Sequence, residues 1–193
     1  MEDQRKNIKD ARIIRDLQKC GVYDQFINKR LHISTLSESL SQIVKSWLTN
    51  KSDTKGLFIH GVASSVVAHL ITKRAYTLGK LPCVIPMHWL YRDEIYDHDI
   101  FRECHTAVIT GVTSSITDSL STEHRRDVEY RIETLTRTLS KRVVLAGDVS
   151  PKDAKGWGAG YLTMLCSQYH LLEAGKSCVD NLEKFSKQGK AGA

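Results

Sequence analysis

The sequence predicts an α/β protein built on a parallel sheet that helices cover on both faces. Three observations carry this prediction. Short, continuously apolar runs alternate with stretches of helical periodicity along most of the chain, as in folds that join parallel strands through helices. The runs lack the alternation of polar and apolar residues that is typical of a sheet with one solvent-exposed face, which indicates strands buried on both sides. The chain of 193 residues, 41% hydrophobic and 26% charged, is long enough for one globular domain with a core.

The first 50 residues are predicted to form a helical lead-in to this domain. Residues 2–19 place a few apolar side chains among many charges, a pattern typical of a short amphipathic helix that lies on the domain or on a partner. Residues 34–50 begin with a Ser or Thr cap and carry leucines at helical spacing, which predicts a second helix. A polar loop then separates the lead-in from the core.

Residues 51–178 are predicted to form the α/β core, and residues 179–193 a flexible tail. A helix expected at 64–79 has one broad apolar face and stops at Gly79. A longer basic amphipathic helix is expected over 123–142, and the run before residue 175 also has a helical pattern. The buried strands expected between the helices span 57–61, 83–86, 106–112 and 143–147.

Composition restricts the classes of function. Lys and Arg number 28 against 22 Asp and Glu, a formal charge of +6 that suits a polyanion such as nucleic acid but is also common on surfaces that bind none. The five cysteines contain no C-x-x-C pair, so neither a disulfide framework nor a zinc ribbon is expected. No apolar run has the ~20 residues needed to span a bilayer, and the N-terminus is charged where a signal peptide is apolar. We therefore expect a cytoplasmic protein without a membrane partner.

The order of the elements and three quoted segments carry a resemblance to a known family. "KCGVYDQFINKRL" precedes the helix predicted at 34–50, "KGLFIHG" forms the first strand, and "VVLAGDVSP" closes a later one. Over residues 19–175 the chain resembles the AAA+ core of bacterial replicative helicase loaders of the DnaC/DnaI type and of the related IstB type. The resemblance implies a P-loop NTPase fold with a RecA-like sheet, and a nucleotide site at the turn after the first strand.

The turn after the first strand retains little of a P-loop. A G-x-x-x-x-G-K-[ST] loop surrounds phosphates with backbone N–H groups, a lysine and a magnesium-binding hydroxyl. In "GVASSVVA" only Gly61 matches, while Val66, Val67 and Ala68 stand at the positions of the second glycine, the lysine and the hydroxyl. Valine supplies no cation and disfavours a positive φ. Ser64 and Ser65 remain as weak anion ligands.

The other positions implied by the resemblance also lack ATPase chemistry. Thr110 and Gly111 stand where the metal-orienting and catalytic carboxylates belong, so nothing there is expected to hold magnesium or polarise water. Asp148 occupies the place of the polar sensor, where its charge repels a phosphate, and Met164 falls at the arginine-finger position. We therefore expect a degenerate nucleotide site, no cofactor and no enzymatic activity.

Two motifs resemble functional sites but are interpreted as structural features. "AGKS" at 174–177 ends like a P-loop, but His170 stands where its first glycine belongs, and the helical pattern before it favours a helix cap at Gly175. A second group of residues resembles a metal site but fits no ligand spacing, so a solvated acidic turn is preferred and no metal is expected. This group comprises Asp93, Glu94, Asp97, His98, Asp99, Cys104 and His105.

The basic helix allows two interpretations. Its cations are positioned to contact phosphates if the region lies along a single-stranded DNA path. Asp127, Glu129 and Glu133 interleave with them, however, and favour a self-paired surface. The cations are Arg125, Arg126, Arg131, Arg137, Lys141 and Arg142. Trp157 and Tyr161 in "GWGAGY" suit stacking on a base, filling a groove of another protein, or a hinge.

The first functional hypothesis is a catalytically inactive AAA+-like adaptor or assembly factor in DNA replication or recombination, in a phage or other mobile element. Its partners would be a helicase, an active AAA+ ATPase or a DNA complex, and self-association through the former nucleotide face is reasonable. The second hypothesis is a nucleic-acid-binding module that uses the basic helix. A small-molecule enzyme ranks last, because no set of acid, base and nucleophile is visible and a fold by itself assigns no chemistry.

Overall fold

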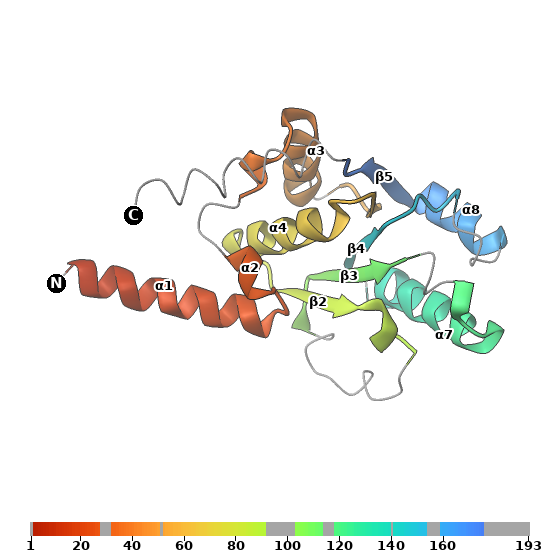
Figure 1. Ribbon diagram of the computed structural model, residues 1–193, viewed down its shortest axis with the longest axis horizontal. Helices are drawn as coiled ribbons and strands as arrows, with labels where there is room; N and C mark the ends of the chain where they lie inside the picture. The colour runs from red at the N-terminus through yellow and green to blue at the C-terminus, as the bar shows by residue number, and fades with distance from the viewer. Residues whose placement is uncertain are drawn as a thin grey trace.

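The computed structural model describes residues 2–27, 32–50, 52–91, 103–113, 118–139, 141–153 and 159–175. Its centre is a five-stranded sheet in the order β2-β3-β4-β1-β5 (Figure 1). Every strand pair is parallel. The predicted parallel α/β fold is therefore confirmed.

The strands are short and lie deep in the molecule. In β1 and β4 the register places Leu57 opposite Val144 and Ile59 opposite Ala146, and all four side chains are buried. Predominantly apolar runs form the central strands because both faces of the sheet are covered. The strands are β1 (Gly56–His60), β2 (Pro82–Pro86), β3 (Thr106–Val112), β4 (Arg142–Gly147) and β5 (Tyr169–Glu173).

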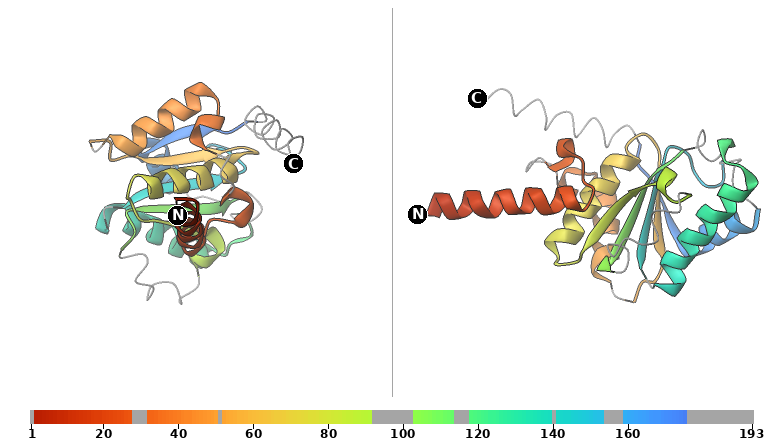
Figure 2. Two further views of the ribbon diagram at one scale, coloured as in Figure 1. Left: turned by 90° about the vertical axis from the view of Figure 1, so that its left-hand side faces the viewer. Right: turned by 90° about the horizontal axis from the view of Figure 1, so that it is seen from below.

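Alternate residues of each strand supply two separate hydrophobic cores. Leu57 and Ile59 of β1 face the core that contains α3 and α4, whereas Phe58 faces the core that contains α7 and α8. The sheet accordingly lies between two helical layers, which Figure 2 shows edge-on at right. The helices are α1 (Glu2–Lys19), α2 (Asp24–Ile27), α3 (Glu38–Thr49), α4 (Ser64–Thr77), α7 (Thr122–Glu133) and α8 (Ala159–Gln168).

Most predicted elements are found within a few residues of their expected bounds. Short 3-10 turns η1 (Ile33–Thr35) and η2 (Met87–Trp89) were not expected. Helix α4 stops as predicted, and Gly79 follows it with a φ of +71° that L side chains rarely adopt. The predicted tail at 179–193 lies outside the described residues. Within the described ranges, every helix is too short or too polar to cross a bilayer.

The N-terminal helix α1 runs outward from the body, with its first residue at the far end (Figures 1 and 2). Its last turns are attached to the domain: Leu17 is buried in the core of α3 and α4, and the Tyr76 hydroxyl donates to Asp16 Oδ2 at 2.6 Å. The carbonyl of Cys20 accepts from the backbone N–H of Val84 on β2 at 2.8 Å. The predicted lead-in therefore packs on the α/β core through its C-terminal part.

Two sequence-based predictions of secondary structure are wrong. The expected helix before Gly175 is replaced at its end by β5, an edge strand paired only with β1. The expected helix 123–142 ends earlier: α7 passes at Thr134 into the π-helical turn η4 (Thr134–Thr138), and Arg142 begins β4. Arg142 thus belongs to the sheet and not to the basic helix.

Candidate functional site

The turn between β1 and α4 is the expected position of a phosphate-binding loop, and it is short. Strand β1 ends at His60 and helix α4 begins at Ser64. Gly61 has a φ of +104°, and a Cβ atom placed there would lie 2.8 Å from the Ala174 carbonyl oxygen. Glycine is required at this position both for its backbone angle and for the close approach of the chain after β5.

The backbone N–H groups of this turn donate to carbonyls of the protein itself. Gly61 N–H donates to Gly147 O at 3.1 Å, and Ala63 N–H donates to Ala174 O at 3.1 Å. Ser64 N–H donates to Gly61 O at 3.0 Å. A P-loop directs such groups toward phosphate oxygens, whereas here they tie the turn to the ends of β4 and β5.

The positions matched to the second glycine, lysine and hydroxyl of a P-loop lie inside α4. Val67 and Ala68 are fully buried, and Val66 is partly buried against the same core. The apolar residues at this place are therefore packing residues of the helix. They do not line the space above the sheet.

A cavity of about 350 Å³ opens above the carboxyl ends of the strands, where ligands of parallel α/β sheets usually bind. It gathers side chains that follow four different strands. Of its described lining residues, Asp148 is the single carboxylate, and none is Lys or Arg. The sequence-predicted members are Gly61, Ser64, Ser65, Thr110, Gly111 and Asp148.

A bulge in β3 shapes one wall of this cavity. The pairing with β4 shifts between Thr110 and Val112, and Gly111 at the shift has a φ of +75°. A Cβ on Gly147 would lie 2.0 Å from Val112 O, so the bulge packs directly on the glycine that ends β4. Thr110 is buried, and its hydroxyl is the group that the strand end offers in place of a carboxylate.

The predicted basic residues do not form one continuous surface. Ser121 Oγ accepts from His124 N–H and caps α7, on which Arg126 is exposed and Arg125 and Arg131 are half-buried. Arg137 on η4 is paired with Glu133 at 2.7 Å. Lys141 precedes the sheet, and Arg142 is occupied within it. Of the predicted set on α7, Arg126 is the residue with an exposed side chain.

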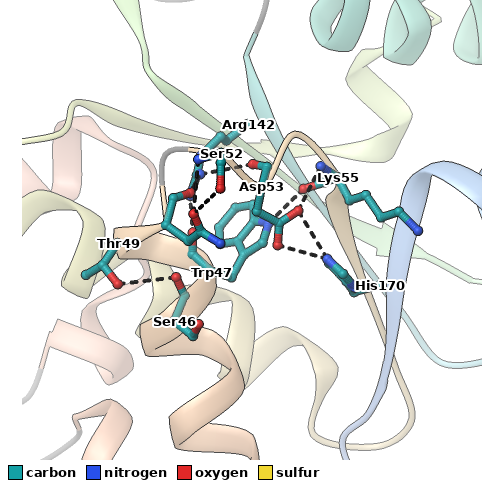
Figure 3. Close-up of polar contacts among 9 residues, drawn as sticks. Ser46, Trp47, Thr49, Ser52, Asp53, Lys55, Arg142 and His170 are labelled. Carbon is teal, nitrogen blue, oxygen red and sulfur yellow. Dashed lines mark hydrogen bonds and ion pairs between the residues drawn. The ribbon is translucent and has the colours of Figure 1, made fainter.

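Arg142 belongs to a polar cluster that sequence reasoning missed (Figure 3). Its guanidinium donates to the carbonyls of Trp47, Asn50 and Asp53 and lies 5.0 Å from the centroid of the Trp47 ring. Burial lowers the pKa of Arg142, while the nearby Asp53 opposes the shift. The guanidinium holds the loop after α3 against the start of β4.

The remaining sequence candidates are dispersed. Met164 on α8 is partly buried in the core of α7 and α8, and Tyr161 is buried. The acidic turn at 93–99 and Trp157 lie outside the described residues. Cys104 is buried, and no group of three or more His, Cys, Asp or Glu that could hold a metal ion occurs within the described ranges.

Comparison with known proteins shows the fold. Neither a protein-family model nor a curated protein matches the sequence. A structure of the replication initiator DnaA bound to AMPPCP and single-stranded DNA matches with a TM-score of 0.57 and 16% identity, over 76% of this chain and 50% of that one. AMPPCP-bound DnaA from Aquifex aeolicus gives 0.59 and 14% over the same shares. DnaI gives 0.54 and 12%, over 69% of this chain and 81% of DnaI.

The chain thus has the parallel-sheet fold of the AAA+ P-loop NTPases DnaA and DnaI. It spans about half the length of the DnaA chains. Identities of 12–16% show the architecture alone, because one fold serves many functions.

Proposed function

We propose that this protein is a nucleotide-independent adaptor or assembly factor in DNA replication or recombination that acts through its surfaces and not through catalysis. The observation that carries the proposal is the bonding of the turn after β1. The N–H groups of Gly61, Ala63 and Ser64 all donate to carbonyls within the protein. An AAA+ fold whose phosphate-binding loop is closed in this way retains the scaffold without the nucleotide.

The energy needed to reopen the loop supports the proposal. A phosphate would compete for N–H groups whose present bonds each contribute roughly 1 kcal/mol. A longer loop would also require the first turns of α4 to unwind, which would remove buried Val67 and Ala68 from the core. The described lining of the cavity contains no Lys or Arg whose attraction to a phosphate would offset these losses. The Asp148 carboxylate would also repel the phosphate.

The proposed setting comes from the structural neighbours. DnaA is a replication initiator and was solved with single-stranded DNA. By analogy we infer that this protein works with DNA and with a helicase or an active AAA+ ATPase. We further propose a role in the replication of a phage or another mobile element, and self-association through the former nucleotide face. An exposed Val62 at that face, 67% accessible, suits a protein contact better than a phosphate.

Calorimetric titration of the purified protein with Mg-ATP tests the proposal, with an AMPPCP-binding DnaA as the positive control. No heat of binding is expected at micromolar concentrations, and no phosphate release above background. Micromolar binding that is lost in Ser64→Ala/Ser65→Ala would overturn nucleotide independence, since those hydroxyls line the cavity. Hydrolysis that persists in this variant would indicate a contaminating ATPase, which a further purification step would remove.

The alternative function is nucleic-acid binding by α7, which the exposure of Arg126 favours. Anisotropy of labelled single-stranded DNA, measured against salt concentration, separates the two proposals. Phosphate contacts by Arg125, Arg126 and Arg131 would give an affinity that falls steeply with salt and that Arg126→Glu weakens. An affinity unchanged by Arg126→Glu would exclude α7 as the binding surface.

A further inference from the structure

A second groove lies away from the cavity at the carboxyl end of the sheet. It holds about 610 Å³ between the last turns of α1, the turn η1 and helix α4. Leu17, Ile33 and Leu70 lie at its base and are nearly inaccessible, whereas Ile14 on α1 is 39% exposed. A base of buried apolar residues beneath an exposed isoleucine marks a surface that can bury more apolar area.

The walls of the groove are held in place. Tyr76 on α4 donates to Asp16 on α1 at 2.6 Å, and the Cys20 carbonyl anchors the end of α1 to β2. Leu70, Lys73 and Thr77 follow one another along the groove side of α4 at helical spacing, as Ile13 and Leu17 do on α1. The groove is therefore formed between two fixed helices, the arrangement in which a third helix packs ridge into groove.

The charged residues that line the groove are basic. His32, Lys45, Lys73 and Arg74 contribute to its lining, and none of the described lining residues is acidic. Lys45 and Arg74 are exposed, while burial lowers the pKa of Lys73. Lys45 and Arg74 therefore place positive charge at the edge of the groove, where it would attract the carboxylates of a partner.

We propose that this groove docks an amphipathic helix of a partner protein, with an apolar stripe that enters between α1 and α4 and with Asp or Glu on its flanks. This inference rests on the adaptor function proposed above and names the surface and the chemistry of its partner. The apolar base selects the stripe, and the exposed Lys45 and Arg74 select the acidic flanks.

A second copy of α1 fits the groove poorly. Lys and Arg outnumber Asp and Glu in α1, so its insertion would place like charges opposite Lys45 and Arg74. Ile8 is the one large apolar residue in its first ten positions, which leaves no stripe of sufficient length. An acidic helix from a different chain satisfies both the apolar and the charged requirements.

A synthetic helical peptide tests the inference on the full chain. The probe is about 15 residues long, or four turns, with Leu at i, i+3, i+4 and i+7 and Glu on both flanks, and its matched control carries Lys for Glu. Chemical shifts of the isoleucine δ1 methyl groups report the site of binding. Ile13, Ile14 and Ile33 in the groove should shift, whereas Ile59 and Ile109 in the sheet should not.

Matched variants connect the binding to the groove. Ile14→Glu should weaken the Glu peptide at least ~10-fold, as loss of an apolar anchor does, whereas Ile43→Glu, at an equally exposed isoleucine on α3 that does not line the groove, should not. Lys45→Glu/Arg74→Glu should weaken it ~10-fold as well, and Arg126→Glu on the opposite face of the sheet should leave it unchanged. Retained Ile59 and Ile109 shifts confirm that each variant is folded.

Four results would overturn the inference. Three of them are equal affinity for the Glu and Lys peptides, no binding of either peptide, and binding that Ile14→Glu leaves intact. The fourth is a dimer in sedimentation that Ile14→Glu dissociates, which would mean that a second copy covers the groove. The Mg-ATP titration is independent of all of these outcomes, so failure of the groove and failure of nucleotide independence are distinguishable.

Discussion

His170 on β5 and Asp53 in the loop after α3 are 117 positions apart in the chain and in direct contact: His170 Nε2 lies 2.9 Å from Asp53 Oδ2 and 3.2 Å from Oδ1. The same carboxylate accepts the backbone N–H of Lys55 at 3.1 Å. Asp53 thereby fastens the loop that enters β1 to the edge strand, as Figure 3 shows.

Replacement of Asp53 should loosen this edge of the sheet. Asp53→Ala removes both contacts and is expected to lower the free energy of unfolding by about 1 kcal/mol, because the His170 side chain is 41% exposed and solvent screens the pair. Asp53→Asn is the control, since its amide oxygen can still accept from Lys55 N–H and His170. Urea denaturation that ranks the two variants equally would contradict this role.

Arg142 should tolerate replacement by lysine poorly. A lysine cannot reproduce the planar set of donors that reaches the Trp47, Asn50 and Asp53 carbonyls, so Arg142→Lys should cost about 1–2 kcal/mol in unfolding free energy. The matched variant Arg126→Lys on α7 should change it by less than about 0.5 kcal/mol. Equal effects in thermal or urea denaturation would mean that the carbonyl contacts contribute little.

His69 should make the protein sensitive to acid. Its ring is buried between Phe26 and Tyr23, with centroids 4.5 and 4.9 Å away, and neither ring nitrogen has a hydrogen-bond partner among the described residues. Burial lowers the pKa of His69 from 6.5 to about 4. Between pH 6.5 and 4 the histidine is protonated in the unfolded chain but neutral in the folded protein. The free energy of unfolding therefore falls as the pH falls.

The free energy of unfolding should fall by roughly 3 kcal/mol between pH 6.5 and 4 because of His69. His69→Leu should remove that part of the pH dependence, while His124→Gln, at an exposed position on α7, should keep it. Urea midpoints measured across this pH range supply the comparison. Parallel curves for the native protein and His69→Leu would show that His69 is not the titrating group.

Gly61, in the turn after β1, should be harder to replace than Gly79 after α4. Gly61→Ala combines a φ of +104° with a Cβ only 2.8 Å from the Ala174 carbonyl oxygen, and is expected to cost about 3 kcal/mol. Gly79→Ala is the control, because its φ is +71° but the space around it is open, so about 1 kcal/mol is expected. Similar losses at both positions would show that contact with Ala174 is unimportant.

The parts of the fold that followed from the sequence are those with a local signal. The central strands were found because runs such as that of β3 are short and predominantly apolar. Strand β5 was missed because it pairs on one side only, which permits His170 and Glu173 within it and imitates a helical pattern. The end of α7 was placed too late because apolar residues keep a helical spacing through η4, where the backbone has already widened into a π-helical turn.

The candidate site divides in the same way. That Val66, Val67 and Ala68 stand in a P-loop register was readable from spacing. Their burial within α4 was not, since it depends on where the helix starts. The cluster of Trp47, Asp53, Arg142 and His170 had no local signal, because its members come from four segments that meet only through strand pairing.

By itself the sequence determined the parallel α/β architecture and the absence of a P-loop lysine, because periodicity and residue identity are properties of neighbouring positions. Only the tertiary structure decided that the amides after β1 are bonded to Gly147 and Ala174, that Arg142 serves the sheet, and that α1 and α4 enclose a basic-edged groove. Those features depend on the order and register of the strands, which bring together groups that lie far apart in the chain.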